Sequence, residues 1–262
     1  MKFTTWNVNS INARIDHLIK FIKIDQSDVY LLQELKCIEE KFPKQEIEKL
    51  GYKSYVNGQK AWNGVAFLSK KPLNILNNNI PTFKEDDNAR FLEAEIILEK
   101  LNKKIRLINI YLPNGNPIET SKFDYKIEWM KKFNKYILDL YNKNIPLIIG
   151  GDFNVIPNDE DVYSPENFKN DACAHPKTRE QFRILINMGF TDLVKYFLDG
   201  NTNWTFWGYR GGGWQKGNGL RIDHFLASPE VADLIKNVKI NREPRSWDKA
   251  SDHTPVTIDV NN

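Results

Sequence analysis

The order of strand-like and helix-like segments constrains the fold more than any other feature of this 262-residue chain. Residues 2–8 and 28–33 are short, bulky apolar runs typical of strands, and the segment between them repeats Ile and Leu at helical spacing. After a short helix expected near residues 43–51, strand-like runs follow one another near residues 52–57, 63–69, 72–76, 90–98 and 104–112. A β-α-β unit followed by consecutive strands predicts two sheets packed face to face with helices outside.

The second half of the chain extends this pattern. Residues 121–143 place apolar side chains on one helical face and are expected to place most of their lysines elsewhere, namely Lys122, Lys126, Lys131, Lys132 and Lys135. The sequence PLIIGGDFN predicts a buried strand that ends in paired glycines. A polar loop to about residue 177 and a helix over 178–188 follow, with further strands near 203–207, 221–227, 237–242 and 254–260. No repeat or low-complexity linker interrupts the sequence, so we expect one α/β domain over residues 1–262.

Composition limits the class of protein. Apolar residues make up 41% of the chain, which is enough for a core, and the net charge of +3 permits a polyanionic partner without requiring one. The two cysteines, Cys37 and Cys173, provide no disulfide framework, and no apolar run approaches the roughly 18 residues of a membrane span. The first residues read as a strand and do not resemble a secretion signal. We therefore expect a soluble, cytoplasmic monomer with no membrane partner.

Several acidic and amide side chains come at the ends of strand-like runs. Glu34 follows VYLLQ, and a carboxylate that leaves a buried strand must be solvated, paired or bound to a hard cation such as Mg²⁺ or Mn²⁺. In GGDFN, Asp152 and Asn154 are two residues apart, so a continuing strand directs both to one face. A carboxylate there could deprotonate a water, and an amide could donate to a phosphoryl oxygen. An Asx turn that closes the strand is the structural alternative.

Asp223 lies inside the apolar segment GLRIDHFLAS, where an isolated charge is costly and a partner is needed. The candidate partner is His253, whose imidazole would gain basicity from the carboxylate and neutralise charge on a phosphate. The adjacent Asp252 could then face a metal ion. His224 follows Asp223 and points to the opposite strand face, so we interpret it as structural.

Seven segments, in this order, resemble the successive motifs of the exonuclease III family of abasic-site endonucleases: TTWNVNSINAR, LLQELK, NGVAFLSK, NIYLPNGN, GGDFN, GLRIDHFLAS and SDHTPV. The resemblance runs from residue 3 to about 258. It implies a four-layer α/β sandwich, with two packed mixed β-sheets flanked by helices. It also implies a DNA-repair phosphodiesterase that hydrolyses the DNA backbone 5′ to abasic sites, with 3′-end processing or 3′–5′ exonuclease activity. The implied partner is double-stranded DNA with abasic sites or 3′ ends.

The resemblance assigns roles at the metal and at the attacking water. Glu34 would be the principal ligand of Mg²⁺ or Mn²⁺, with Asn7 and Asp252 beside it. Asp152 would activate the water, and Asn154 would position either Asp152 or the phosphate.

Four further roles concern the phosphate. By resemblance, Tyr111 and Asn114 would stabilise the pentavalent transition state of in-line hydrolysis, and Asp223 would orient His253 towards a phosphate oxygen. Whether Asp152 or His253 is the general base stays open at this point.

Three positions depart from the family pattern. Leu35 stands where the family commonly has Thr, Ser10 replaces a frequent Gly, and position 9 is Asn9 where some relatives carry Asp. Because position 9 could affect the affinity or number of metal ions, one-metal and two-metal schemes both stay open. In a two-metal scheme the alternative ligands are Asp152, Asn154 and His253.

The stretch NWTFWGYRGGGWQKGNGLR, residues 203–221, interleaves aromatic rings with glycines and with the cations Arg210, Lys216 and Arg221. Rings stack on sugars or bases and cations bind phosphates, so we expect a mobile DNA-binding rim. Core aromatics beside a flexible loop are the structural alternative. By resemblance, an apolar pocket for a flipped-out abasic sugar would be walled by Phe206, Leu220 and Ile222. The remaining residues expected to contact DNA are Lys60, Trp62, Asn63, Arg90, Arg210 and Trp214.

Other functions remain possible at this level. The superfamily also contains nonspecific nucleases, lipid phosphodiesterases and inositol phosphate phosphatases. A DNA-binding module that keeps the fold without catalysis is a different class, and the complete set of polar groups argues against it.

Overall fold

Two six-stranded sheets form the centre of the computed structural model, which describes residues 1–200 and 202–261. The strands of the first sheet are β1 (Lys2–Asn7), β2 (Val29–Gln33), β3 (Lys53–Asn57), β4 (Val65–Ser69), β11 (Ile235–Ile240) and β12 (Val256–Val260). Those of the second are β5 (Asn74–Asn77), β6 (Phe91–Leu98), β7 (Lys103–Tyr111), β8 (Leu147–Asp152), β9 (Thr191–Asp192) and β10 (Asp223–Ala227). Their spatial orders are β11-β12-β1-β2-β4-β3 and β5-β6-β7-β8-β10-β9.

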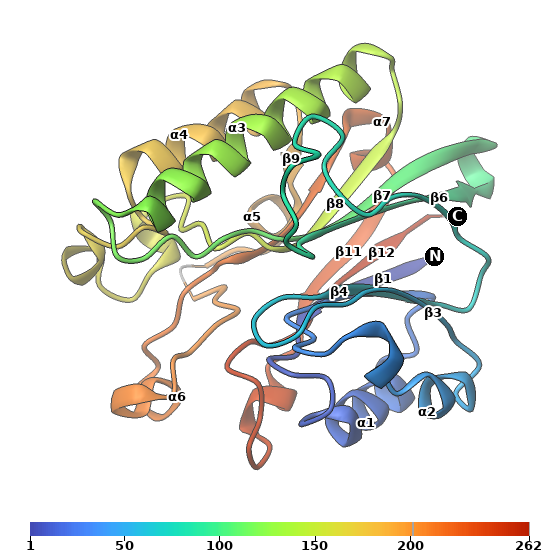
Figure 1. The fold of residues 1–262 in the computed structure, drawn as a ribbon, viewed down its shortest axis with the longest axis horizontal. Helices are drawn as coiled ribbons and strands as arrows, with labels where there is room; N and C mark the ends of the chain where they lie inside the picture. The colour runs from blue at the N-terminus through green and yellow to red at the C-terminus, as the bar shows by residue number, and fades with distance from the viewer. Residues whose placement is uncertain (201, 262) are drawn as a thin grey trace.

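The longer α-helices cover the outer faces of both sheets. The longer ones are α1 (Ile15–Asp25), α3 (Ser121–Asn142) and α4 (Pro176–Asn187), and the shorter ones are α2 (Lys44–Glu48), α5 (Leu193–Phe197), α6 (Gly213–Lys216) and α7 (Pro229–Ala232). In Figure 1, α1 and α2 lie on one side of the two sheets and α3 and α4 on the other. Apolar clusters fill the three spaces between helices, sheet, sheet and helices. The expected four-layer α/β sandwich is confirmed.

Each sheet has one parallel pair of strands at its centre. β1 runs parallel to β2, and β7 runs parallel to β8, whereas the other pairings within the sheets are antiparallel. Both parallel pairs arise from β-α-β connections, because parallel neighbours require a crossover that a helix can supply. The carboxyl ends of these four strands are therefore the natural place for a site.

The paired glycines before Asp152 are explained by close packing. A Cβ on Gly150 would lie 2.4 Å from Phe225 Cε1 and 2.9 Å from Leu31 Cδ2 of the other sheet. A Cβ on Gly151, where φ is +150°, would lie 2.0 Å from the carbonyl oxygen of Ile110. Any larger residue would push β8 away from its neighbours.

A buried polar bridge between Gln33 and Asn109 crosses the space between the sheets. Gln33 Nε2 on β2 donates to Asn109 Oδ1 on β7 at 2.8 Å. Asn109 Nδ2 in turn donates to the carbonyl oxygens of Leu32 and Ala66 in the first sheet, at 3.0 and 2.9 Å. Both side chains are fully buried, so these bonds satisfy groups that would otherwise be costly to bury.

The structure departs from the sequence expectations at two places and adds four short elements. Residues 203–207 do not form a strand, because only Phe206 makes isolated bridges, to Leu220 and His253. The short elements β9, α5, α6 and α7 were not expected. Lys126 lies on the buried face of α3 beside Trp129 and Met130, not on its solvated face. Among the described residues, no helix has the length and apolar character needed to cross a membrane.

Candidate active site

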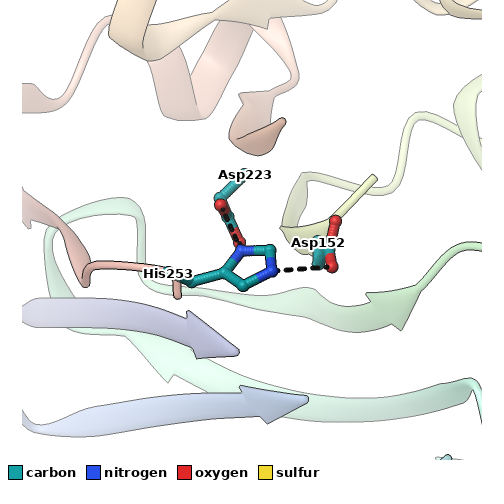
Figure 2. Close-up of side chains that lie close together, drawn as sticks. All are labelled: Asp152, Asp223 and His253. Atoms are coloured by element: carbon teal, nitrogen blue, oxygen red, sulfur yellow. Dashed lines mark hydrogen bonds and ion pairs between the residues drawn. The ribbon is translucent and has the colours of Figure 1, made fainter. Parts of the chain in front are cut away.

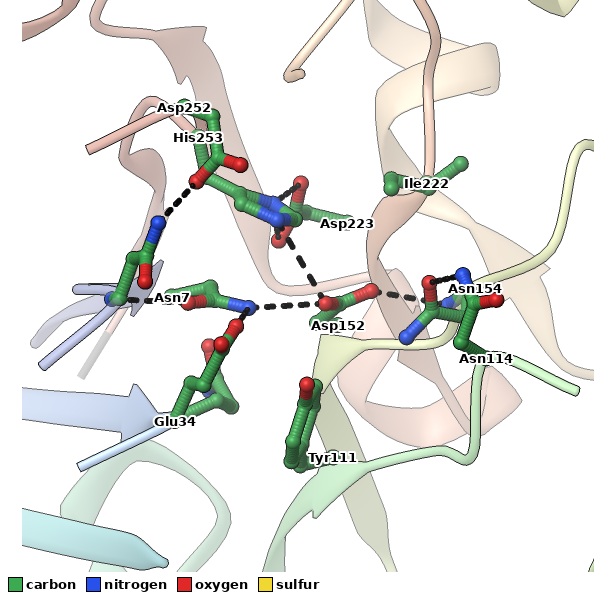
Figure 3. A network of polar contacts seen from close by, with 12 residues as sticks. Asn7, Glu34, Tyr111, Asn114, Asp152, Asn154, Ile222, Asp223, Asp252 and His253 are labelled. Carbon is green, nitrogen blue, oxygen red and sulfur yellow. Dashed lines mark hydrogen bonds and ion pairs between the residues drawn. The ribbon is translucent and has the colours of Figure 1, made fainter. Parts of the chain in front are cut away.

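Polar side chains from both sheets converge where the parallel strands end (Figure 3). Asn7 ends β1 and Glu34 follows β2, while Tyr111 and Asp152 end β7 and β8. Asn7 joins the two sheets, because its Nδ2 donates to Glu34 Oε2 and to Asp152 Oδ2, each at 2.9 Å. Glu34 has a left-handed backbone with φ of +57°, which turns the chain away from the strand direction. The structure thus brings together groups that are far apart in the sequence.

Asp223 and His253 form the expected pair (Figure 2). His253 Nδ1 lies 2.9 Å from Asp223 Oδ2 and 3.1 Å from Oδ1, and both residues are almost fully buried. Thr205 Oγ1 donates to Asp223 Oδ2 at 2.6 Å and accepts the backbone N–H of Asp223 at 3.1 Å. The carboxylate is therefore held from two directions, which fixes the orientation of the imidazole. The contribution of Thr205 was not expected, and no sequence spacing signals it.

The other ring nitrogen of His253 faces Asp152. Nε2 lies 3.7 Å from Asp152 Oδ2. Burial disfavours the charged imidazole, but the carboxylates of Asp223 and Asp152 outweigh burial and raise the pKa of His253 to about 10. Burial raises the pKa of Asp152 to about 7; Asp223 adds to this, whereas His253 and Asn7 oppose it. A protonated imidazolium beside an ionised Asp152 is thus the favoured state between about pH 7 and pH 10.

Two amide side chains lie next to Asp152. Its Oδ1 accepts the backbone N–H of Asn154 at 2.9 Å, which is the Asx-type contact considered from the sequence. Asn154 has a left-handed backbone with φ of +47°, and its Oδ1 accepts from Asn114 Nδ2 at 3.2 Å. Asn154 Nδ2 donates to the carbonyl oxygen of Leu112 at 2.9 Å. The two amides therefore form one hydrogen-bonded unit.

Tyr111 is held between an acid and a cation. The guanidinium of Arg90 lies 4.9 Å from the centre of its ring and donates to its carbonyl oxygen at 3.1 Å. Burial raises the pKa of Tyr111 well above its ordinary value, and Glu34 and Asp152 add to this. The phenol therefore keeps its proton and can act as a hydrogen-bond donor.

Hard oxygen atoms gather beside Glu34. Lys36 Nζ lies 2.9 Å from Glu34 Oε1 and 2.6 Å from Asn9 Oδ1. Asn9 Nδ2 donates to Asp252 Oδ1 at 2.9 Å, so Asn9 links Lys36 to the second acid. The sequence had pointed to the position of Asn9 but not to Lys36, although a lysine two residues after Glu34 was visible. Carboxylate and amide oxygens suit Mg²⁺ or Mn²⁺. In this structure the ammonium group of Lys36 supplies the positive charge beside them.

A second group of possible ligands is less suitable. Atoms of Asp152, Asp223 and His253 lie within 4.8 Å of one another, a spacing that could hold a metal ion. However, His253 Nδ1 and Thr205 already bond to Asp223, and a protonated imidazole offers no lone pair to a metal. The donor set around Glu34 therefore fits a hard cation better.

The polar groups of the site line a pocket of about 380 Å³. Phe206, Leu220 and Ile222, for which the resemblance implied a sugar pocket, also line it. Tyr163 and Phe168, from the loop after β8, also line it and pack edge to face with ring centres 5.8 Å apart. These two aromatic residues were missed, because they follow no strand or helix period.

The expected DNA-contacting residues fall into two groups. Lys60, Trp62 and Arg210 are exposed, with 73% of Trp62 accessible, and Arg210 also lines the pocket. Asn63 is buried and donates to Gln59 and Asn88.

Trp214 and Arg221, which were both expected to meet DNA, pack inwards. Trp214 is half-buried, and its ring centre lies 4.9 Å from that of the buried Trp207. The expectation that Arg221 meets phosphate is wrong, because only 1% of its side chain is exposed. Its guanidinium instead bonds to Asp161 at 2.7 and 3.0 Å and to Asp192 at 2.6 Å.

Comparisons with known proteins agree with this geometry. The model of the endonuclease/exonuclease/phosphatase family matches residues 4–253. The chain is 33% identical over 264 residues to an exodeoxyribonuclease III of Haemophilus influenzae, covering 98% of each chain. A solved 3′ phosphatase from Neisseria, bound to a product DNA hairpin, superposes with a TM-score of 0.93 at 33% identity and 99% coverage of both chains. An AP endonuclease structure from Archaeoglobus fulgidus gives a TM-score of 0.92 at 30% identity, with complete coverage of both chains.

Proposed function

The chain belongs to the endonuclease/exonuclease/phosphatase family, and on that premise we propose that it is a metal-dependent nuclease that hydrolyses duplex DNA 5′ to abasic sites. The observation that carries the proposal is one pocket with two kinds of lining. Glu34, Asp152 and His253, a set suited to phosphodiester hydrolysis, line it together with the apolar side chains of Phe206, Leu220 and Ile222. A single copy of the chain is proposed to suffice for activity, because the groups that line the pocket all belong to it, and a cytoplasmic location is proposed as well.

Asp152 is proposed as the general base and His253 as the cation that neutralises a phosphate oxygen. A base works best when its pKa lies near the working pH, and the pKa of Asp152 of about 7 meets this condition. The pKa of His253, about 10, keeps its proton in place at neutral pH, so the imidazolium is poorly suited to accept another. Asp223 orients the ring through its contact with Nδ1.

Mg²⁺ or Mn²⁺ is proposed as the cofactor, held by Glu34 and Asp252 with Asn7 beside them. Asn7 would ligate through Oδ1, whereas its Nδ2 faces Glu34 here, so binding requires its amide to turn over. When bound, the ion supplies Lewis-acid neutralisation of phosphate charge. A one-metal scheme is favoured, because His253 is engaged by Asp223 and protonated.

Tyr111, Asn114 and Asn154 are proposed to donate to the phosphate oxygens as negative charge develops there. Tyr111 keeps its phenolic proton, and the Asn114–Asn154 unit is fixed before substrate arrives. Preformed donors of this kind need no reorganisation in the transition state.

Substrate choice is proposed to depend on the apolar side of the pocket. Phe206, Leu220 and Ile222 would accept a sugar that lacks its base, and an abasic nucleotide is easily flipped because it has little stacking to lose. DNA contacts are proposed for Lys60, Trp62, Asn63, Arg90, Arg210 and Trp214. Of these, the exposed Lys60, Trp62 and Arg210 have the best access to the DNA backbone.

One panel of substrates tests the proposal. Duplexes with a single abasic site, with a 3′-phosphate and without damage are incubated with Mg²⁺, Mn²⁺ or chelator, next to an inositol phosphate. Cleavage of the abasic strand that leaves a 3′-hydroxyl, dependent on metal and lost in Asp152→Asn, is the expected result. Hydrolysis of the inositol phosphate alone would contradict the proposal. DNA binding without cleavage of any duplex between pH 6 and 9 would favour an inactive binding module.

A further inference from the structure

A buried lysine lies directly behind the two catalytic amides. Lys126 projects from α3, and none of its surface is exposed. Its Nζ donates to the carbonyl oxygen of Asn114 at 3.0 Å and to that of Asn154 at 2.6 Å. These two carbonyls belong to different loops, one after β7 and the other after β8. The ammonium group is thus a bridge between the backbones that carry the amides.

Burial of this ammonium group is costly, so it calls for an explanation. Among the described residues, no carboxylate lies within ion-pair distance of Lys126, and burial lowers the pKa of its amine. An aliphatic residue at this position of α3 would fill the apolar face more cheaply. The chain also makes room for the lysine, because a Cβ on Gly115 would lie 2.5 Å from Lys126 Cδ. Packing alone therefore does not account for Lys126.

The two loops depend on this bridge for their relative position. Neither the residues after Tyr111 nor those after Asp152 continue a strand. Asn154 instead adopts a left-handed backbone with φ of +47°, so the chain leaves the strand direction at the residue that carries the amide. Its amide and that of Asn114 meet at 3.2 Å, a contact that a small shift of either loop would break.

We propose that Lys126 is a positioning residue for catalysis: by bonding both backbone carbonyls, it holds the amides of Asn114 and Asn154 in register at the phosphate. This inference rests on the proposed nuclease function. It predicts that loss of the ammonium slows the chemical step while DNA binding and the fold are kept, since Lys126 does not reach the pocket.

Lys126→Met tests the inference, because methionine keeps the length and apolar stem but removes the donors. Cleavage of the abasic duplex is measured under saturating and limiting DNA, with thermal unfolding in parallel. The kcat should fall on the order of 10- to 100-fold, because ångström-scale misplacement of catalytic groups has effects of this size. The KM and the affinity for DNA should change by less than about threefold. Lys126→Arg, which can still donate to two carbonyls, should recover most of the loss. Lys135→Met is the matched control, since it removes the same charge from an exposed position of α3.

A double-mutant comparison separates positioning from general stability. If Lys126 acts through the amides, Lys126→Met should cost little further kcat in an Asn154→Ala background. A kcat within about threefold of the unmodified protein, or a full additional loss in that background, would overturn the inference. If the methionine variant does not fold, Lys126→Gln, which keeps one donor group, is compared with Lys126→Arg in the same way. Absence of cleavage by the unmodified protein would instead refute the proposed function.

Discussion

Asp223→Asn should remove the charge of His253 at the pH at which the enzyme works. The substitution keeps the size of the side chain and an oxygen that can still accept from Nδ1, so packing is little changed. Asp223 is the largest influence that holds the proton on this buried ring, whose pKa is about 10. At pH 8 such a ring is about 99% protonated, whereas a histidine with an ordinary pKa of about 6.5 is about 3% protonated. In Asp223→Asn, the protonated fraction of His253 at pH 8 should fall towards that of an ordinary histidine.

The protonation state can be read directly by NMR of histidines labelled with ¹³C and ¹⁵N. The titration is run with chelator, and the signal of His253 is assigned from its absence in His253→Gln. In Asp223→Asn the midpoint should fall by at least two pH values. The kcat at pH 8 should drop on the order of 100- to 1,000-fold, which is the usual contribution of one donor to a developing oxyanion. Because the protonated ring is the active form, the deficit relative to the unmodified enzyme should shrink as the pH falls.

A titration midpoint of His253 in Asp223→Asn within half a pH value of that in the unmodified protein would contradict this prediction. In that case Asp152, 3.7 Å from Nε2, would suffice to hold the proton, and Asp223 would serve only to orient the ring.

Four other substitutions test three further predictions. Asp223→Ala and His253→Ala should act as a unit, so the double variant should lose little more kcat than the worse single variant; additive losses would contradict the pair. Asp152→Asn should lower kcat by orders of magnitude while the DNA affinity, measured by fluorescence anisotropy, stays within a few-fold; a parallel loss of binding would make Asp152 a binding residue. Arg221→Met should reduce the free energy of unfolding in urea by about 3–5 kcal/mol, since it leaves two buried carboxylates unpaired; a loss under about 1 kcal/mol would show that they escape to solvent.

Much of the fold could be predicted because period and order are local properties. The apolar runs that form β1, β2, β7 and β8 are visible in the sequence. The polar residues at the carboxyl ends of these strands are the ones that meet in the site. Motif order placed Glu34 and Asp152 in one site, although their distance could not be derived from spacing.

The failures share a physical cause, which is dependence on a distant partner. Arg221 looks like a surface cation, but its partners Asp161 and Asp192 lie 60 and 29 residues away. Lys126 looks like part of a solvated helix face, and only the loops folded against α3 reveal its acceptors. The aromatic wall formed by Tyr163 and Phe168 belongs to an irregular loop, for which periodicity offers no signal.

The bridge between Gln33 and Asn109 matters for the active site, because the site is built from residues of two different sheets. Glu34 belongs to one sheet and Asp152 to the other, so the distance between them is a distance between sheets. Sliding of one sheet over the other would leave these buried amides without partners, at about 1–3 kcal/mol each. The bond from Gln33 to Asn109 therefore helps to fix the distance between Glu34 and Asp152, although both bonded side chains lie in the interior of the protein.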